Sequence, residues 1–532
     1  MTLLNSTPTR SKRLDQLSFN RLHARLVWGS GIGWAMDAMD VGLISFIMVA
    51  LPESWNMAPQ DKSWIAAAGF MGMAIGASVG GLVADRLGRR QVFAVTLLVY
   101  GLATGASALA WGVGALIALR FVVGLGLGAE LPVASTLVSE FSPPRIRGRV
   151  IVWLEAFWAL GWTAAALIGY FIAAPTGLFG ANGWRWALVV GAAPALYAVF
   201  VRRSLPESVR FNESKGRFAE AEAAVQAFEA AARTKNRPED ADPSAARPDN
   251  PPAGTKNRPH DADPSAPSPA NTPAGTKNRP DDADPSAPGP ADPAYSTKHS
   301  AAAAPAPRPH GQRWMEAGRE RTASGEGEAV REAARAHPRA LFTGGMARRT
   351  AAIWAVWFCV NFAYYGAFTW LPSLLVADGV AVTKSLGYTL IITLAQLPGY
   401  ACAAWLIELW GRRVTLAVVL VGAAGAAGLF AGAQGAAGII GAGMTLSFFN
   451  LGAGGALYAI TPEIYPTPLR GTGAGWAAGF GRLASIVTTL VTIPLHTALG
   501  TGPVFVLFAG CFIVAAAAAW ALPEMRGQVL DD

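Results

Sequence analysis

Long apolar stretches dominate this 532-residue chain and set what it can fold into. A helix needs about 20 apolar residues to cross the roughly 30 Å hydrocarbon core of a bilayer. Hydrophobic residues make up 52% of the chain and charged residues only 15%. The mean hydropathy is +0.32 although residues 202–349 are very polar. The chain is therefore predicted to be an all-α integral membrane protein and not a soluble enzyme.

Twelve stretches have the length of a membrane span, six on each side of the polar segment. They cover residues 26–50, 64–84, 91–110, 115–139, 150–173, 184–201, 350–376, 386–407, 414–432, 435–460, 472–496 and 503–521. The predicted organisation is an N-terminal tail (1–25), a six-helix half (26–201), a central loop (202–349), a second six-helix half (350–521) and a C-terminal tail (522–532).

Positive charge predicts the orientation of these spans. Outside the central loop, Lys and Arg cluster at the N-terminal tail, near residues 86–90, 145–149, 412–413 and 470, and at Arg526. The alternate short loops hold only Lys62, Arg185 and Lys384. The Lys- and Arg-rich side is cytoplasmic by the positive-inside rule, so both termini and the central loop are expected inside. No cleavable signal is expected, because the first apolar stretch is too long.

The two halves repeat one another. The motif Gly81-x-x-x-Asp85-Arg-x-Gly88-Arg89-Arg90 has a counterpart in Ala404-x-x-x-Glu408-Leu-x-Gly411-Arg412-Arg413. Glu140 with Arg147 has a counterpart in Glu463 with Arg470, and the interval from Glu140 to Glu463 equals that from Gly88 to Gly411. Independent motifs with one common offset indicate a tandem duplication of a six-helix unit.

The central loop contains a smaller repeat. Thr-Lys-Asn-Arg-Pro begins at Thr234, Thr255 and Thr276, which are evenly spaced. Rich in Pro, Ala and Asp, the tract is expected to be disordered because it has little apolar surface to bury. Between Glu213 and Arg233 the spacing of Phe218, Val225 and Phe228 favours a short amphipathic helix. Cys359, Cys402 and Cys511 have neither disulfide nor metal-ligand spacing and are interpreted as packing residues.

These motifs, with the run Arg120-x-x-x-Gly124-x-Gly126-x-Gly128 and the six-plus-six layout, resemble the major facilitator superfamily. The resemblance implies a fold of 12 transmembrane helices and alternating access around a central site. Residues 33–45, 130–140, 357–366, 394–400 and 447–452 further resemble bacterial niacin (nicotinate) transporters of the metabolite:proton symporter group. The implied function is import of a small aromatic carboxylate by proton symport across the inner membrane. The long central loop departs from that group's pattern.

Ionisable residues inside spans are costly and usually functional. The proton-coupling candidates are Asp37, Asp40, Arg120 and Glu130. Asp40 matches the proton-accepting aspartate of proton-linked sugar porters, with Arg120 as its electrostatic partner; a static buried ion pair is the alternative. For Glu130 and Glu155, an acid hydrogen-bonded between helices remains as good an interpretation as coupling.

Neutral polar and aromatic residues of the second half surround one cation. The substrate-binding candidates are Trp357, Asn361, Tyr364, Tyr365, Gln396, Asn450 and Arg482. An aromatic ring would stack on Tyr or Trp, and a guanidinium would bind the carboxylate. Helix packing is the alternative for each aromatic residue taken alone.

The motif loops give the gating candidates, whose alternative is simple surface solvation. They are Gly81, Asp85, Gly88, Arg89, Arg90, Glu140, Arg147, Glu408, Gly411, Arg412, Glu463 and Arg470. No catalytic or metal site, cofactor or nucleic-acid partner is expected, and the protein is expected to work as a monomer in the bilayer. Benzoate-like acids are the second substrate class; drug efflux and a non-transporting sensor are weaker alternatives.

Overall fold

The computed structural model describes residues 9–235, 338–466 and 469–524. These segments contain helices and no strands. Apart from Thr234 and Lys235, the tandem repeats of the central loop lie outside the described residues, as do the first eight and last eight residues of the chain.

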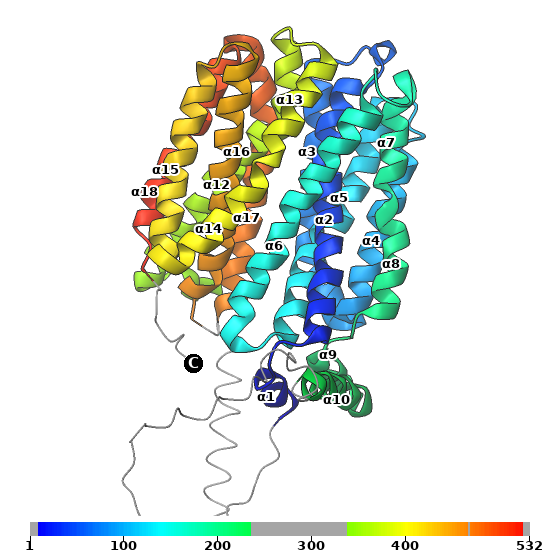
Figure 1. The fold of residues 1–532 in the computed structure, drawn as a ribbon, viewed down its shortest axis with the longest axis vertical. Helices are drawn as coiled ribbons and strands as arrows, with labels where there is room; N and C mark the ends of the chain where they lie inside the picture. Colours follow the sequence, from blue (N-terminus) through cyan, green and yellow to red (C-terminus); the bar gives the residue numbers. More distant parts are fainter. Residues whose placement is uncertain (1–8, 236–337, 467–468, 525–532) are drawn as a thin grey trace, which may run out of the picture. The chain divides into compact units, whose positions relative to one another are not determined.

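The first half comprises the helices of residues 21–204 (Figure 1). They are α2 (Arg21–Ala50), α3 (Pro59–Leu87), α4 (Arg89–Ser107), α5 (Val113–Phe141), α6 (Pro144–Ile168), α7 (Gly183–Gly191) and α8 (Ala193–Ser204). A π-helical turn, Gly169–Ala173, extends α6. The predicted sixth span is thus two helices. Pro194, at the start of α8, cannot donate a backbone hydrogen bond into α7, which explains the break.

The second half repeats this order. Its helices are α12 (Gly344–Ala377), α13 (Val382–Leu394), α14 (Gln396–Trp410), α15 (Arg412–Ala431), α16 (Gly435–Ile464), α17 (Arg470–Leu499) and α18 (Thr501–Trp520). The predicted eighth span is divided between α13 and α14, and Pro398 lies in the first turn of α14. The break again follows from a missing backbone donor.

Packing is duplicated along with the sequence. In the first half α2 packs on α6, α3 on α5, and α4 on α5 and α8. The corresponding contacts in the second half join α12 to α17, α14 to α16, and α15 to α16 and α18. The halves meet chiefly through α3 with α17 and α2 with α12. Each half is therefore a complete packing unit, and the two units face one another across a few helices.

Glycine spacing explains how closely α5 approaches its neighbours. Gly124 and Gly128 face the backbone of α3, whereas Gly126 faces the side chain of Tyr100 on α4. A Cβ at Gly124 or Gly128 would overlap the carbonyl oxygens of Gly69 or Met73. The Gly-x-Gly-x-Gly run is thus a packing surface in a membrane helix, where small residues permit close backbone contact.

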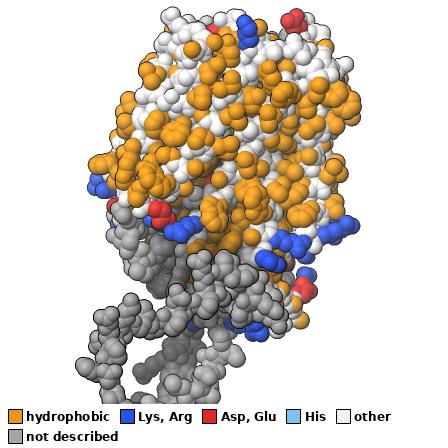
Figure 2. All heavy atoms as spheres, viewed as in Figure 1, with side chains coloured by type: hydrophobic (Ala, Val, Ile, Leu, Met, Phe, Trp, Pro, Cys, Tyr) orange, Lys and Arg blue, Asp and Glu red, His pale blue; other side chains and the backbone are white. Residues whose placement is uncertain are grey.

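Among the described residues, eleven helical segments are long and apolar enough to cross a membrane. The helix at the third predicted span, α4, is not one of them. It begins with Arg89-Arg90-Gln91 and includes Thr and Ser, which lowers its apolar character. Packed between α5 and α8, it nevertheless occupies the third position of the first half. Apolar side chains cover the surface of the helices, and most visible Lys and Arg gather near one end (Figure 2).

Short helices flank the two six-helix halves. The N-terminal tail contains α1 (Arg10–Asp15), which was not predicted, and α2 begins at Arg21. After α9 (Val209–Ser214), α10 runs over Phe218–Lys235 and confirms the amphipathic helix. Val225 and Phe228 are buried, but Phe218 is 56% exposed because it begins the helix. A 3₁₀ turn, Pro338–Phe342, leads into α12.

Candidate functional site

A buried ion pair joins two helices of the first half. Asp40 on α2 and Arg120 on α5 lie 3.1 Å apart, Oδ2 to Nη1. The hydroxyl of Thr104 on α4 donates a 2.6 Å hydrogen bond to Oδ1 of Asp40. Asp40 is fully buried and Arg120 is 3% exposed. Removing one member of such a pair leaves an uncompensated buried charge. The contacts among α2, α4 and α5 at this point therefore depend on the charge of the Asp40 carboxyl group.

A second buried group lies one helical turn away. Asp37 on α2 is close to Glu130 on α5 and to Tyr100 on α4. All three side chains are buried. None of the ion pairs among the described residues involves Asp37 or Glu130. Asp37 also lies within electrostatic range of Asp40 and of Arg482. The four proton-coupling candidates therefore occupy one continuous region.

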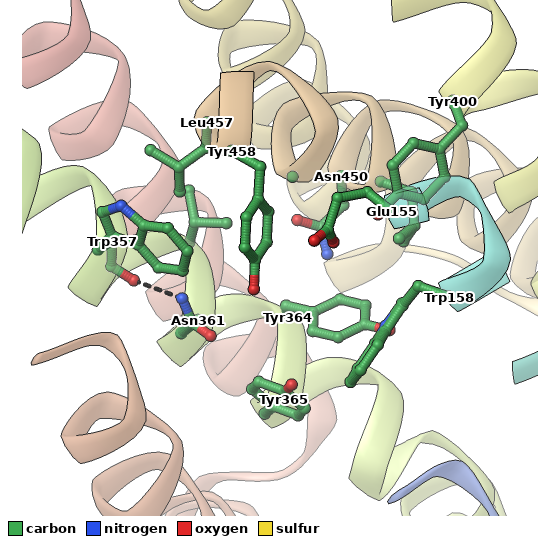
Figure 3. Close-up of a pocket in the computed structure, with 13 residues that line it drawn as sticks. Glu155, Trp158, Trp357, Asn361, Tyr364, Tyr365, Tyr400, Asn450, Leu457 and Tyr458 are labelled. Atoms are coloured by element: carbon green, nitrogen blue, oxygen red, sulfur yellow. Dashed lines mark hydrogen bonds between the residues drawn. The ribbon is translucent and has the colours of Figure 1, made fainter. Parts of the chain in front are cut away.

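A small, partly open pocket lies between the halves and is lined by residues of both. The first half contributes Glu155 and Trp158 from α6 (Figure 3). The second half contributes the remaining wall: Trp357, Val360, Asn361, Tyr364, Tyr365, Tyr400, Asn450, Leu451, Gly454, Leu457 and Tyr458.

Five of the seven predicted substrate contacts line this pocket. They are Trp357, Asn361, Tyr364, Tyr365 and Asn450. Gln396 does not line it, although the residue is buried and neither of its amide atoms has a hydrogen-bond partner in the described structure. Arg482 does not line it either. Its Nη1 donates a 2.8 Å hydrogen bond to the hydroxyl of Tyr365, so this cation sits behind a residue of the pocket wall.

Tyrosines organise the pocket. The indole N–H of Trp158 on α6 donates a 2.9 Å hydrogen bond to the hydroxyl of Tyr364 on α12, which ties the halves together. The ring of Tyr365 packs edge-on against Phe70 of α3, with centroids 4.7 Å apart. Sequence reasoning missed Trp158, Tyr400 and Tyr458 as lining residues. Their helices are apolar all round, and no periodicity marks the face that looks inward.

The gating candidates form repeated contacts within each half. Arg89 pairs with Glu140 at 3.4 Å, and Arg412 pairs with Glu463 at 3.1 Å. The hydroxyl of Ser208 also donates a hydrogen bond to Glu140. The two ion pairs are related by the common offset between the halves, so the duplication extends to individual contacts.

Two glycines with left-handed backbone open the helices that follow them. Gly88 and Gly411 have φ values of +102° and +86°. A Cβ on Gly88 would lie 2.6 Å from Glu207, and one on Gly411 would lie 2.8 Å from Glu524. Glu207 accepts a 3.1 Å hydrogen bond from the backbone N–H of Arg90 and so stabilises the start of α4. The sequence repeats Leu-Pro-Glu at residues 205–207 and 522–524, but it does not reveal that these motifs meet the glycine loops.

Other gating candidates make contacts that the sequence does not indicate. Arg147 binds Asp15 at 3.1 Å and the carbonyl oxygen of Ser142, because the tail folds back over this end. Glu408 was grouped with Arg412, but its carboxylate lies 3.3 Å from Arg149 of the first half. Gly81 has open space around it. The side chains of Asp85 and Arg470 lie outside the described residues.

Comparison with known proteins places this arrangement in a wider group. Residues 31–489 match the model of the Major Facilitator Superfamily. The niacin transporter NiaP of Acinetobacter baylyi is 37% identical over 98% of both chains. The putative niacin/nicotinamide transporter NiaP of Bacillus subtilis is 37% identical over 88% of this chain and 87% of its own. The partially occluded, inward-open xylose transporter XylE from E. coli superimposes with a TM-score of 0.65, at 14% identity, over 96% of this chain and all of XylE.

Proposed function

The chain belongs to the Major Facilitator Superfamily, a family of membrane transporters and not of enzymes, and we propose that it imports niacin (nicotinate) by proton symport. The observation that carries the proposal is the 37% identity with a niacin transporter along nearly the whole of both chains. The bacterial relatives and the apolar helices support a location in the cytoplasmic membrane. The distribution of Lys and Arg supports both termini inside. No cofactor is needed, because the proton gradient supplies the energy.

The buried ion pair supports proton coupling. Asp40 takes up a proton from the outside, which cancels its attraction to Arg120 and loosens the contact between α2 and α5. Release of the proton to the inside restores the pair. Asp37 and Glu130 extend the path for the proton on the same side of the first half. A static pair would hold the helices together equally well but would not make transport depend on the gradient.

The pocket supports a small aromatic carboxylate as the substrate. Trp357, Tyr364 and Tyr458 offer ring faces and edges to a planar molecule. The Arg482–Tyr365 pair lies behind the wall, so the Tyr365 hydroxyl carries part of the guanidinium's attraction for an anion towards the pocket. Benzoate-like acids are the second candidate. Drug efflux and a sensor role have no comparable support.

Duplication of the halves supports alternating access. The pocket lies between two units that carry equivalent internal ion pairs, and rocking of one unit against the other would expose it to each side in turn. The pocket is complete within one chain, which supports a monomer as the working unit.

Uptake into proteoliposomes tests the proposal. Purified full-length protein is reconstituted and given labelled nicotinate at low concentration, with and without an inward proton gradient, against unlabelled nicotinate, nicotinamide or benzoate. We expect accumulation that needs the gradient and yields to nicotinate more than to benzoate. Uptake that does not depend on the proton gradient would contradict symport. The competition pattern would still distinguish between the substrate classes.

A further inference from the structure

The pocket proposed to take an anion contains a carboxylic acid in its wall. Glu155 on α6 is 3% exposed, and it is the only carboxylic acid among the residues described as lining the pocket. Its carboxyl group points into the middle of the pocket beside Tyr458 (Figure 3). A carboxylate here repels the carboxylate of a substrate, and a buried charge is costly without a partner. The arrangement therefore requires an explanation beyond anion binding.

Nothing described in the protein satisfies this carboxyl group. No hydrogen bond or ion pair of Glu155 is found within residues 9–235, 338–466 and 469–524, and its electrostatic neighbours are Arg482, Tyr365, Tyr400 and Tyr458. Arg482 donates its hydrogen bond to Tyr365 instead. Buried polar groups without partners are rare, and one directed into a ligand cavity is well placed to bind a ligand atom.

We propose that Glu155 recognises the ring nitrogen of the substrate by a hydrogen bond and so selects a pyridine carboxylate over a benzene carboxylate. The inference rests on the proposed function and names its specificity determinant. Repulsion from Glu155 turns the substrate carboxylate away, towards Tyr365 and Arg482. The ring nitrogen of nicotinate, which is meta to the carboxylate, can then face Glu155. It shares one proton with the carboxyl group in a hydrogen bond, whereas the C–H of benzoate leaves the acid unsatisfied.

Two variants of one residue separate this role from packing. In Glu155→Met the side chain keeps its length but cannot hydrogen-bond. In Glu155→Gln the amide still offers a donor and an acceptor to the ring nitrogen. Thr163→Ala, further along α6, removes a hydroxyl that bonds only to the carbonyl oxygen of Ala159 and serves as the matched control.

Calorimetric titration of the detergent-purified full chain measures the dissociation constants of nicotinate, nicotinamide and benzoate. We expect the wild type to bind nicotinate at least roughly tenfold more tightly than benzoate, as one charge-assisted hydrogen bond allows. Glu155→Met should weaken the binding of nicotinate and nicotinamide, which share the ring nitrogen. The dissociation constants of nicotinate and benzoate should then agree within about threefold. Glu155→Gln and Thr163→Ala should keep the preference.

Several results would overturn the inference. Equal affinity of the wild type for nicotinate and benzoate would show that the ring nitrogen is not recognised, while leaving aromatic acid transport intact. This measurement does not depend on the folding of any variant. If Glu155→Met weakens the binding of all three ligands equally, or of none of them, Glu155 has a packing role. Loss of the preference in Glu155→Gln equal to that in Glu155→Met rules out the hydrogen bond. A wild type that binds no nicotinate at all defeats the proposed function itself, and the role of Glu155 with it.

Discussion

Nε of Arg149 lies 3.3 Å from Oε1 of Glu408 and joins the first half of the protein to the second. Both side chains are more than half exposed. The pair sits at the end of α14 and near the start of α6, at the end where most of the arginines gather. The Arg89–Glu140 and Arg412–Glu463 pairs stay within one half each, whereas opening of the halves at this end must break the Arg149–Glu408 pair.

Charge neutralisation at this contact should favour opening of the arginine-rich end. In Glu408→Gln we expect the open population to rise about 1.4- to 5-fold, because an exposed ion pair contributes about 0.2–1 kcal/mol. Spin-label distances between the ends of α6 and α14 measure the populations. The exchanged pair Arg149→Glu with Glu408→Arg should restore the wild-type distribution. An unchanged distribution in Glu408→Gln at low salt would show that the pair is incidental.

Removal of the charge on Asp40 should uncouple transport from the gradient. A gradient of one pH unit supplies about 1.4 kcal/mol per proton, enough for roughly tenfold accumulation of nicotinate. In Asp40→Asn we expect accumulation to fall to about onefold while exchange of labelled for unlabelled nicotinate continues. Both are measured in the same proteoliposomes. Ser107→Ala, on α4 one turn from Thr104, is the control and should accumulate normally. Gradient-driven accumulation by Asp40→Asn would exclude Asp40 as the proton site.

Loss of the guanidinium behind the pocket should weaken binding of the substrate carboxylate. We expect Arg482→Gln to raise the dissociation constant of nicotinate about 10- to 100-fold, the effect of losing an interaction with a charged group. Nicotinamide, which has no carboxylate, should be affected less. Tyr365→Phe keeps the ring and loses only the hydroxyl, so its effect should lie between wild type and Arg482→Gln. Equal nicotinate affinity in wild type and Arg482→Gln would show that Arg482 does not contribute to substrate binding.

The N-terminal helix α1 is held against α10 by ion pairs that should respond to pH. Arg13 binds Glu222 and Glu229, both at 2.7 Å, and Arg10 binds Glu213 and Glu222. Hydrogen bonds from Arg13 hold the pKa of Glu222 and of Glu229 below the ordinary glutamate value. A lowered pKa means that the contribution is present above the unfolded pKa of about 4.3 and is lost as pH falls through the folded value.

Hydrogen exchange of α1 measures this docking. Near neutral pH we expect Arg13→Ala to speed exchange of residues 10–15 by roughly 2- to 30-fold, since two partly exposed ion pairs are removed. Lys12→Ala, an exposed neighbour without a side-chain partner among the described residues, should have no effect. The difference between Arg13→Ala and wild type should shrink as the pH falls below about 4. A difference that persists there would mean that packing, not charge, holds α1.

Span positions, the duplication and the Asp40–Arg120 pairing were predictable from the sequence, because length, hydropathy and repeated motifs are properties of the chain itself. The family matched by residues 31–489 was predictable for the same reason. Contacts between distant segments were not. Arg147 was named with Glu140 as a gating candidate, yet it binds Asp15 of a tail whose short helix has no hydrophobic periodicity. Glu155 was interpreted either as an acid hydrogen-bonded between helices or as a coupling group, and not as a pocket residue, since which face of α6 meets the pocket depends on how the halves dock.

Close glycine packing is distributed unevenly between the two halves, and this has a mechanical consequence. Gly72, Gly76 and Gly80 on α3 lie so near α5 that a Cβ would overlap its atoms, and Gly124 and Gly128 face them. The duplication places Ala395, Gly399, Ala403, Ser447 and Leu451 at the equivalent positions of the second half. Only one glycine of this set is kept there. Glycines that meet have no side-chain rotamers to rearrange, so we expect α3 and α5 to move together as one rigid pair of helices. The equivalent contact of α14 with α16 carries Ser447 and Leu451 in place of glycines, and we expect it to repack more readily during transport.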